Sequence, residues 1–186
     1  MNTKVILIHG NSGYTQENFW LPYVAAELKK LGLTVIAKTF PDNKLARAEY
    51  WLPFITELGA DENTILIGHS SGAIAAMRYA ENHKLLGSVL VSTYYTDLDD
   101  EEEKASGYFN HPWNWEKIRS NQKWIIQFAS MDDPWIPIEE ARFIHEKLET
   151  RYFEYTNEGH FGIPNDKKEF PEIITEIKKA LQINPY

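Results

Sequence analysis

The chain of 186 residues contains no cysteine, which excludes disulfides, thiolate metal sites and a cysteine nucleophile. Long apolar runs are also missing, and none approaches the roughly 20 residues that cross a membrane. The apolar run at residues 5–8 is too short for the apolar region of a signal peptide. We therefore expect a cytoplasmic protein that does not associate with membranes.

Positive charge is scarce as well, because 19 Lys and Arg stand against 27 Asp and Glu, for a net charge of −8. Such a chain repels nucleic-acid phosphates and anionic membrane surfaces, so neither is expected as a partner. The phosphate-binding motif G-x-x-x-x-G-K-[ST], the dinucleotide motif G-x-G-x-x-G and the zinc motif H-E-x-x-H do not occur. We predict no cofactor and no metal.

What the chain does contain is an alternation of short apolar segments with helical patterns from end to end. The helical pattern at residues 45–58 includes Pro53, which predicts a kink or two short helices there. Other helical patterns fall at residues 21–31, 73–79, 138–148 and 171–181. Six segments have the pattern of buried strands: residues 5–8, 34–37, 64–67, 88–91, 124–128 and 152–155.

This alternation predicts one α/β domain over residues 1–186. We expect a compact three-layer sandwich of about six mainly parallel strands, with helices on both faces of the sheet. In such folds the ligand site lies beyond the carboxyl ends of the strands, near the point where the strand order reverses. Residues that directly follow a strand are therefore the first candidates for chemistry.

The pentapeptide at residues 68–72 follows the third strand and has the form G-x-S-x-G. An alanine-rich helical pattern comes directly after it. This is the context of a nucleophile elbow, a tight strand-to-helix turn that exposes a serine hydroxyl above the sheet. We predict Ser70 as the nucleophile.

A serine nucleophile needs a base, and the base needs a group that orients it. In this architecture the order along the chain is Ser, then acid, then His. His160 follows the last strand, after the acid candidates, and is predicted as the base. Asp133 begins a D-x-x-[VI]-P pattern after the fifth strand and is favoured as the acid. Asp132 is expected to cap that loop, and Glu158 is a remote alternative acid.

An oxyanion hole needs two main-chain N–H groups aimed at the developing charge. We predict the amides of Ser71, at the start of the elbow helix, and of Asn11, in the glycine-bearing loop after the first strand.

Residues 95–116 form a lid-like insertion between the fourth and fifth strands, and its aromatic part either walls a substrate pocket or packs onto the body of the protein. The acidic run at residues 97–103 is expected to be a solvated loop rather than a cation site. Candidate pocket residues are His9, His69, Tyr108, Phe109, Trp113, Trp135 and Phe161.

With these residues in place, the chain closely resembles the retinoblastoma-binding protein 9 family of small serine hydrolases. The resemblance covers nearly the whole chain, and its most specific stretches are residues 67–81, 105–109, 112–118 and 132–134. It implies an α/β-hydrolase core that lacks the first antiparallel hairpin of larger members. Carried over residue by residue, it places the triad on Ser70, Asp133 and His160.

The chain departs from that family in two places. The L-x-C-x-E motif that binds retinoblastoma-type pocket proteins corresponds to residues 58–62, where Ala60 replaces the cysteine, so this binding is not expected. Ser12 stands where the family often has glycine, so the loop predicted to supply the second oxyanion donor differs from the family pattern. We predict a serine hydrolase that cleaves small carboxylic esters or amides through an acyl-enzyme. The alternative is a protein-interaction module with a vestigial hydrolase site.

Overall fold

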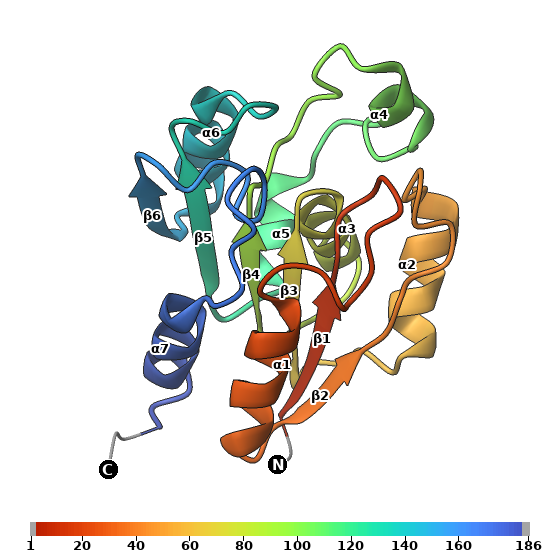
Figure 1. Ribbon diagram of the computed structural model, residues 1–186. Coiled ribbons are helices and arrows are strands. Elements are labelled where there is room, and N and C mark those ends of the chain that lie inside the picture. Colours follow the sequence, from red (N-terminus) through yellow and green to blue (C-terminus); the bar gives the residue numbers. More distant parts are fainter. Residues whose placement is uncertain (1–2, 184–186) are drawn as a thin grey trace.

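The computed structural model describes residues 3–183 and contains one sheet of parallel strands (Figure 1). Every pair of neighbouring strands in it is parallel, which confirms the α/β prediction and makes the sheet more uniform than expected. The strand order is β2-β1-β3-β4-β5-β6. The strands are β1 (Lys4–Ile8), β2 (Thr34–Ala37), β3 (Thr64–His69), β4 (Gly87–Val91), β5 (Ile125–Ser130) and β6 (Arg151–Tyr155).

Helices cover both faces of this sheet. On one face, α1 and α7 pack against each other and against the strands, and the larger group that includes α2, α3 and α6 covers the other (Figure 1). The predicted three layers are therefore present. The helices of the described residues are α1 (Leu21–Lys30), α2 (Ala48–Glu57), α3 (Ser71–Ala80), α4 (Glu101–Ala105), α5 (Trp115–Ser120), α6 (Ile138–Leu148) and α7 (Pro171–Ala180).

The position of β1 between two layers of helices explains why its sequence is apolar throughout. Because side chains alternate along a strand, Ile6 and Ile8 join the core beneath α2 and α3, while Val5 and Leu7 join the core beneath α1 and α7. All four side chains are at most 1% exposed. Each fully buried aliphatic side chain contributes about 1.5–3 kcal/mol, so this two-sided burial anchors the centre of the sheet.

The helix around Pro53 differs from the prediction. It is a single helix, α2, that starts only at Ala48 and runs through Pro53. Residues 42–47 form a turn instead, in which Asp42 and Ala46 adopt positive φ and the Asp42 carboxylate accepts hydrogen bonds from Arg47. This turn brings residues 43 and 44 against the loop that follows β1.

The parallel strands place the candidate residues together at the carboxyl-terminal edge of the sheet, where all the strands end. From β1 the chain moves to β2 on one side and later returns to β3 on the other, so the order reverses between β1 and β3. The crevice at such a reversal is the usual ligand site of an open α/β sheet. Figure 1 shows α4, from the insertion between β4 and β5, projecting beyond this same edge. None of the helices described here is long and apolar enough to cross a membrane.

Candidate active site

Ser70 lies at the turn between β3 and α3, with a backbone conformation of φ 55° and ψ −124°. This combination of φ and ψ is energetically unfavourable for a residue with a side chain. The flanking strand and helix hold Ser70 in it. A Cβ at Gly68 would overlap the backbone of Gly72, and a Cβ at Gly72 would overlap the backbone at the end of β1. The two glycines of the motif are therefore required by close backbone packing, as a nucleophile elbow demands.

His160 and Asp133 come together although 27 residues separate them. The Nδ1–H of His160 donates to Oδ2 of Asp133 at 2.8 Å. The other oxygen of Asp133 accepts the main-chain N–H groups of Trp135 and Ile136 at 3.1 and 3.2 Å. The carboxylate is thus held from both sides and fixes the imidazole in the tautomer whose Nε2 can accept a proton.

Ser70 and His160 line the same cavity. No hydrogen bond joins the Ser70 hydroxyl to His160 among the described residues. Catalytic hydrogen bonds are often long in the absence of substrate and tighten when it binds. The arrangement is that of a serine and a pre-oriented imidazole in one pocket.

Asp132, the neighbouring carboxylate, holds the loop rather than the imidazole. Its Oδ1 accepts the hydroxyl of Ser130 at 2.6 Å and the N–H of Gly159 at 2.9 Å. The Ser130 hydrogen bond is the main reason that the pKa of Asp132 is lowered. The alternative acid Glu158 pairs with Lys167 at 3.0 Å. Asp132 therefore ties the His160 loop to the end of β5.

The two other histidines of the site are buried and neutral. Burial, together with the neighbouring His160, lowers the pKa of His69 to about 3. Its Nε2–H donates to the carbonyl of His160 at 2.8 Å, and its ring lines the cavity. Burial also lowers the pKa of His9. The Nδ1–H of His9 donates to the carbonyl of Gly10 at 2.7 Å, and its Nε2 accepts the N–H of Phe40 at 2.8 Å. His9 lies behind the loop and does not line the cavity.

The loop after β1 uses the N–H groups of Ser12 and Gly13 for contacts within the protein, but not that of Asn11. Ser12 and Gly13, both at positive φ, donate their main-chain N–H groups to Lys44 and Asn43 at 2.9 Å. The main-chain N–H groups of Asn11 and Ser71 have no acceptor among the described residues. Ser71 is the first residue of α3, where the helix dipole favours negative charge. Both predicted oxyanion donors are therefore unoccupied beside Ser70.

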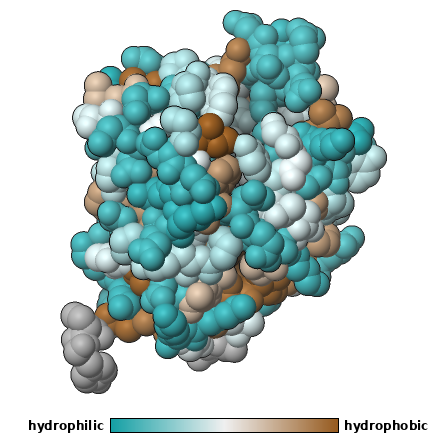
Figure 2. Space-filling view, viewed as in Figure 1, coloured by the Kyte–Doolittle hydropathy of each residue, from teal (hydrophilic) through white to brown (hydrophobic). Residues whose placement is uncertain are grey.

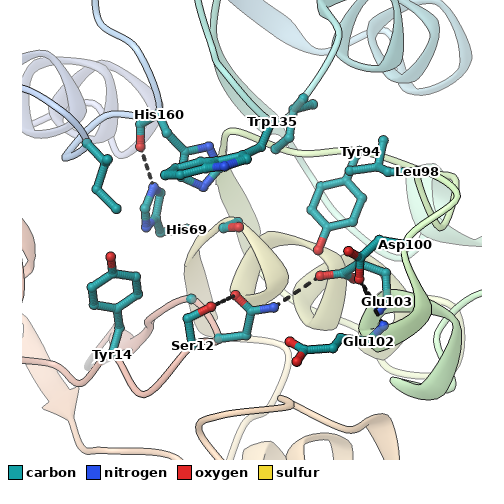
Figure 3. A pocket seen from close by; sticks show the side chains of 15 residues that line it. Ser12, Tyr14, His69, Tyr94, Leu98, Asp100, Glu102, Glu103, Trp135 and His160 are labelled. Carbon is teal, nitrogen blue, oxygen red and sulfur yellow. Dashed lines mark hydrogen bonds between the residues drawn. The ribbon is translucent and has the colours of Figure 1, made fainter.

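The cavity has a volume of about 350 Å³ and two walls (Figure 3). One wall comes from the strand-end loops and includes Trp135, whose ring stands edge-on to that of His160 at 4.9 Å. The other wall comes from Tyr94 and the insertion, with Leu98, Asp100, Glu102 and Glu103. Figure 3 shows the three carboxylates on this second wall.

The aromatic part of the insertion is fastened to the body of the protein. The buried guanidinium of Arg78, on α3, donates to the carbonyls of Tyr108 and His111 at 2.7 and 2.6 Å, and lies 3.6 Å from the ring centre of Trp113. Tyr108, Phe109 and Trp113 consequently do not line the cavity. Phe161, also expected there, is buried against Phe170 instead. Of the predicted pocket residues, His69 and Trp135 do line it.

The acidic wall was missed by sequence reasoning, which expected a solvated loop at residues 97–103. Part of this run is the helix α4, and Asp100 caps it by accepting the N–H groups of Glu102 and Glu103 at 2.9 and 3.0 Å. The sequence did contain a signal for the start of this helix, because Asp100 and Glu103 have the spacing of an N-cap and its third helical residue. Within residues 3–183, no group of three or more His, Cys, Asp or Glu is arranged to hold a metal ion.

Comparisons with known proteins agree on the family. A family model described as "Serine hydrolase" matches residues 5–179. The chain is 46% identical over 182 residues to "Serine hydrolase RBBP9" of Rattus norvegicus, which covers 96% of each chain. It is 28% identical to "Putative hydrolase YdeN" of Bacillus subtilis (strain 168), over 87% of each chain.

Solved structures show the same fold. The crystal structure of the ydeN gene product from B. subtilis has a TM-score of 0.88 at 23% identity, covering 97% of this chain and 100% of that one. The Pyrococcus furiosus esterase Pf2001 has a TM-score of 0.64 at 18% identity, covering 97% and 81%. With a family model and a close relative over almost its whole length, the chain is a hydrolase of the α/β-hydrolase fold and belongs to the serine hydrolase family.

Proposed function

We propose that this hydrolase cleaves small carboxylic esters or amides through an acyl-enzyme, with Ser70, His160 and Asp133 as its triad. The observation that carries the proposal is the 2.8 Å hydrogen bond between His160 and Asp133. His160 lines the same cavity as Ser70, the serine of the elbow. That geometry supplies a nucleophile, a base and a group that orients the base.

In the acylation step, Oγ of Ser70 attacks the carbonyl carbon, and its proton moves to Nε2 of His160. The carbonyl oxygen becomes an oxyanion that the N–H groups of Ser71 and Asn11 receive. When the tetrahedral intermediate collapses, His160 gives its proton to the leaving oxygen or nitrogen. Asp133 stabilises the imidazolium between these two transfers.

In the deacylation step, a water molecule attacks the ester formed on Ser70 and loses its proton to His160. The second tetrahedral intermediate collapses, Ser70 recovers its proton from His160, and the carboxylic acid leaves. The neutral state of His69 suits this cycle. Its ring lies 4.9 Å from that of His160, and a charged neighbour at that distance would oppose protonation of His160.

The expected partner is a small-molecule substrate, since the cavity has room for a compact one. The three carboxylates on one wall disfavour substrates with a negative charge. The interaction module with a vestigial site is not favoured, because membership of the serine hydrolase family and an assembled His–Asp pair both support catalysis. Retinoblastoma-type pocket proteins remain unexpected partners, given Ala60.

The test is covalent labelling with a fluorophosphonate probe, with mass spectrometry to locate the adduct. We expect the adduct on Ser70, and we expect Ser70→Ala to abolish it and to lower kcat for a neutral p-nitrophenyl ester by about 10⁵-fold or more. Ser120→Ala is the matched control, because Ser120 is exposed on α5 and does not line the cavity. It should keep both labelling and hydrolysis. Hydrolysis retained by folded Ser70→Ala would overturn the assignment.

A further inference from the structure

Glu103, on α4, makes a contact that the proposed triad mechanism does not use. Its Oε1 accepts the side-chain N–H of Asn11 at 3.1 Å, across 92 residues of sequence (Figure 3). Asn11 is also the residue whose main-chain N–H is one of the two proposed oxyanion donors. Glu103 therefore contacts one arm of the oxyanion hole directly.

The same carboxylate approaches the second arm through Tyr94. The Tyr94 hydroxyl faces Glu103 closely enough for hydrogen bonding between them to shift the pKa of each (Figure 3). That hydroxyl also lies 3.4 Å from the hydroxyl of Ser71. Tyr94 is only 2% exposed and Ser71 is also buried. One carboxylate thus lies between the side chains of the two residues that carry the proposed oxyanion donors.

A carboxylate is an unexpected group at this place. Negative charge near a developing oxyanion opposes catalysis, and burying a carboxylate is unfavourable unless hydrogen bonds compensate for it. Burial indeed raises the pKa of Glu103, against the hydrogen bonds from Tyr94 and Asn11. The unfavourable burial of the Glu103 carboxylate is therefore offset by the side chains of Tyr94 and Asn11, which flank the proposed oxyanion hole.

The segment that carries Glu103 is held to the rest of the protein before and after α4. Before it, Glu140 of α6 accepts the N–H of Tyr95 at 2.8 Å and the hydroxyl of Thr96 at 2.7 Å. After it, the carbonyl of Ser106 accepts the N–H of Ala48 at 2.8 Å. The Glu103 side chain therefore projects from a braced segment, as a group that orients another group should.

We propose that Glu103 is a positioning residue of the oxyanion hole. It holds the Asn11 side chain, and through Tyr94 it restrains Ser71. The main-chain N–H groups of Asn11 and Ser71 thereby stay directed at the same oxyanion. This inference rests on the proposed acyl-transfer function. It assigns no contact between Glu103 and the substrate, so its loss should appear in kcat rather than in KM.

The experiment compares Glu103→Ala, Glu103→Gln, Asn11→Ala and the Asn11→Ala/Glu103→Ala double variant on a neutral p-nitrophenyl ester. Glu103→Ala and Asn11→Ala should each lower kcat roughly 10- to 100-fold, with KM changed less than about threefold. The double variant should be no slower than the slower single variant, because both remove one interaction. Glu103→Gln keeps an oxygen for Asn11 and should retain kcat within about threefold of the wild type.

The matched control is Glu101→Ala, which removes an exposed carboxylate from the same helix that does not line the cavity. It should keep kcat within about threefold, which separates positioning from a general effect of charge. Circular dichroism and thermal melting of each variant establish folding. If Glu103→Ala does not fold, the comparison of Asn11→Ala with Glu103→Gln decides, since the proposal requires the first to be slow and the second to be active.

Three results would overturn the proposal while leaving the hydrolase assignment intact, provided that Ser70→Ala is inactive. These are an unchanged kcat in Glu103→Ala, independent effects that multiply in the double variant, and an effect confined to KM. An active Ser70→Ala would instead overturn the proposed triad itself. Failure of the two proposals is thus distinguishable.

Discussion

The two walls of the cavity are built in different ways, although they face the same space. The strand-end wall carries His69, Ser70 and His160, which parallel strands bring to one edge of the sheet by their register. The insertion wall carries Glu102 and Glu103 on a helix of five residues, with Asp100 as its N-cap, and a contact with Asn11 far along the chain holds this helix. In the proposed mechanism, the sheet supplies the reacting groups and the insertion supplies orientation and charge selection.

The surface of the molecule is consistent with this contrast. Figure 2 shows hydrophilic residues over most of the face that is turned to the viewer in Figure 1, with a few hydrophobic residues between them. Trp135 and Met131, both more than half exposed, follow β5. The acidic helix of the insertion is mostly exposed apart from Glu103, whereas the aromatic residues that follow it pack inward. One insertion thus contains a segment that faces the cavity and a segment that faces the core.

The largest effect should come from removing the Asp133 carboxylate, which orients His160 on the strand-end wall. Asp133→Asn should lower kcat by about 10⁴-fold near neutral pH, because an amide cannot hold His160 in the required tautomer and charge state. Steady-state hydrolysis of a neutral ester measures this. Asp132→Asn is the control, since an amide oxygen can still accept the N–H of Gly159. Equal losses in the two variants would contradict the assignment of Asp133.

A smaller effect should follow from releasing the aromatic part of the insertion. Arg78→Met removes donors from the carbonyls of Tyr108 and His111 and leaves the partly buried carboxylate of Glu81 without its 2.9 Å partner. We expect the free energy of unfolding to fall by about 3 kcal/mol, measured by urea denaturation. The kcat of the folded variant should fall less than tenfold, because these residues do not line the cavity.

The control for Arg78 is Arg119→Met. Arg119 pairs with Glu149 at the surface, where both side chains are more than half exposed. Removing this pair should have little effect on stability, since solvent screens exposed ion pairs. A similar loss of stability in both variants would show that Arg78 is not a specific fastening for the insertion.

The smallest of the three effects concerns acid, and it tests the strand-end wall through His69. Its folded pKa of about 3 lies below the ordinary value of 6.5, so the unfolded chain binds more protons between these values. Stability should therefore fall as pH drops below 6.5, by about 2 kcal/mol at pH 5 from this group. His69→Gln should reduce the difference in unfolding free energy between pH 8 and pH 5 by that amount. An unchanged difference would contradict a neutral, buried His69.

Much of the fold could be predicted from local patterns. The run at residues 5–8 is apolar at every position because β1 is buried on both faces, and such runs are typical of central parallel strands. The tight turn at residues 68–72 is evident from its glycines, since no other residue fits the close backbone contacts there. The position of His160 after the last strand and of Asp133 after the fifth made them candidates before their hydrogen bond was seen.

Other features could not be predicted because they depend on distant partners. Helical propensity alone extended the second helix to residue 45, but the hydrogen bonds between Arg47 and Asp42 form a turn there. Aromatic density suggested a pocket wall at Tyr108, Phe109 and Trp113, but it cannot tell core packing from ligand contact. The buried Arg78, which lies on another element, decides between the two.

By itself, the sequence determined the order of strands and helices, the parallel α/β architecture and the elbow at Ser70, because periodic burial and backbone strain act over a few residues. Only the tertiary structure decided which carboxylates face the cavity, which histidines stay neutral, and that Glu103 meets Asn11. These properties depend on burial and on contacts between segments up to 92 residues apart. The packing of the whole domain creates those contacts, and no local pattern encodes them.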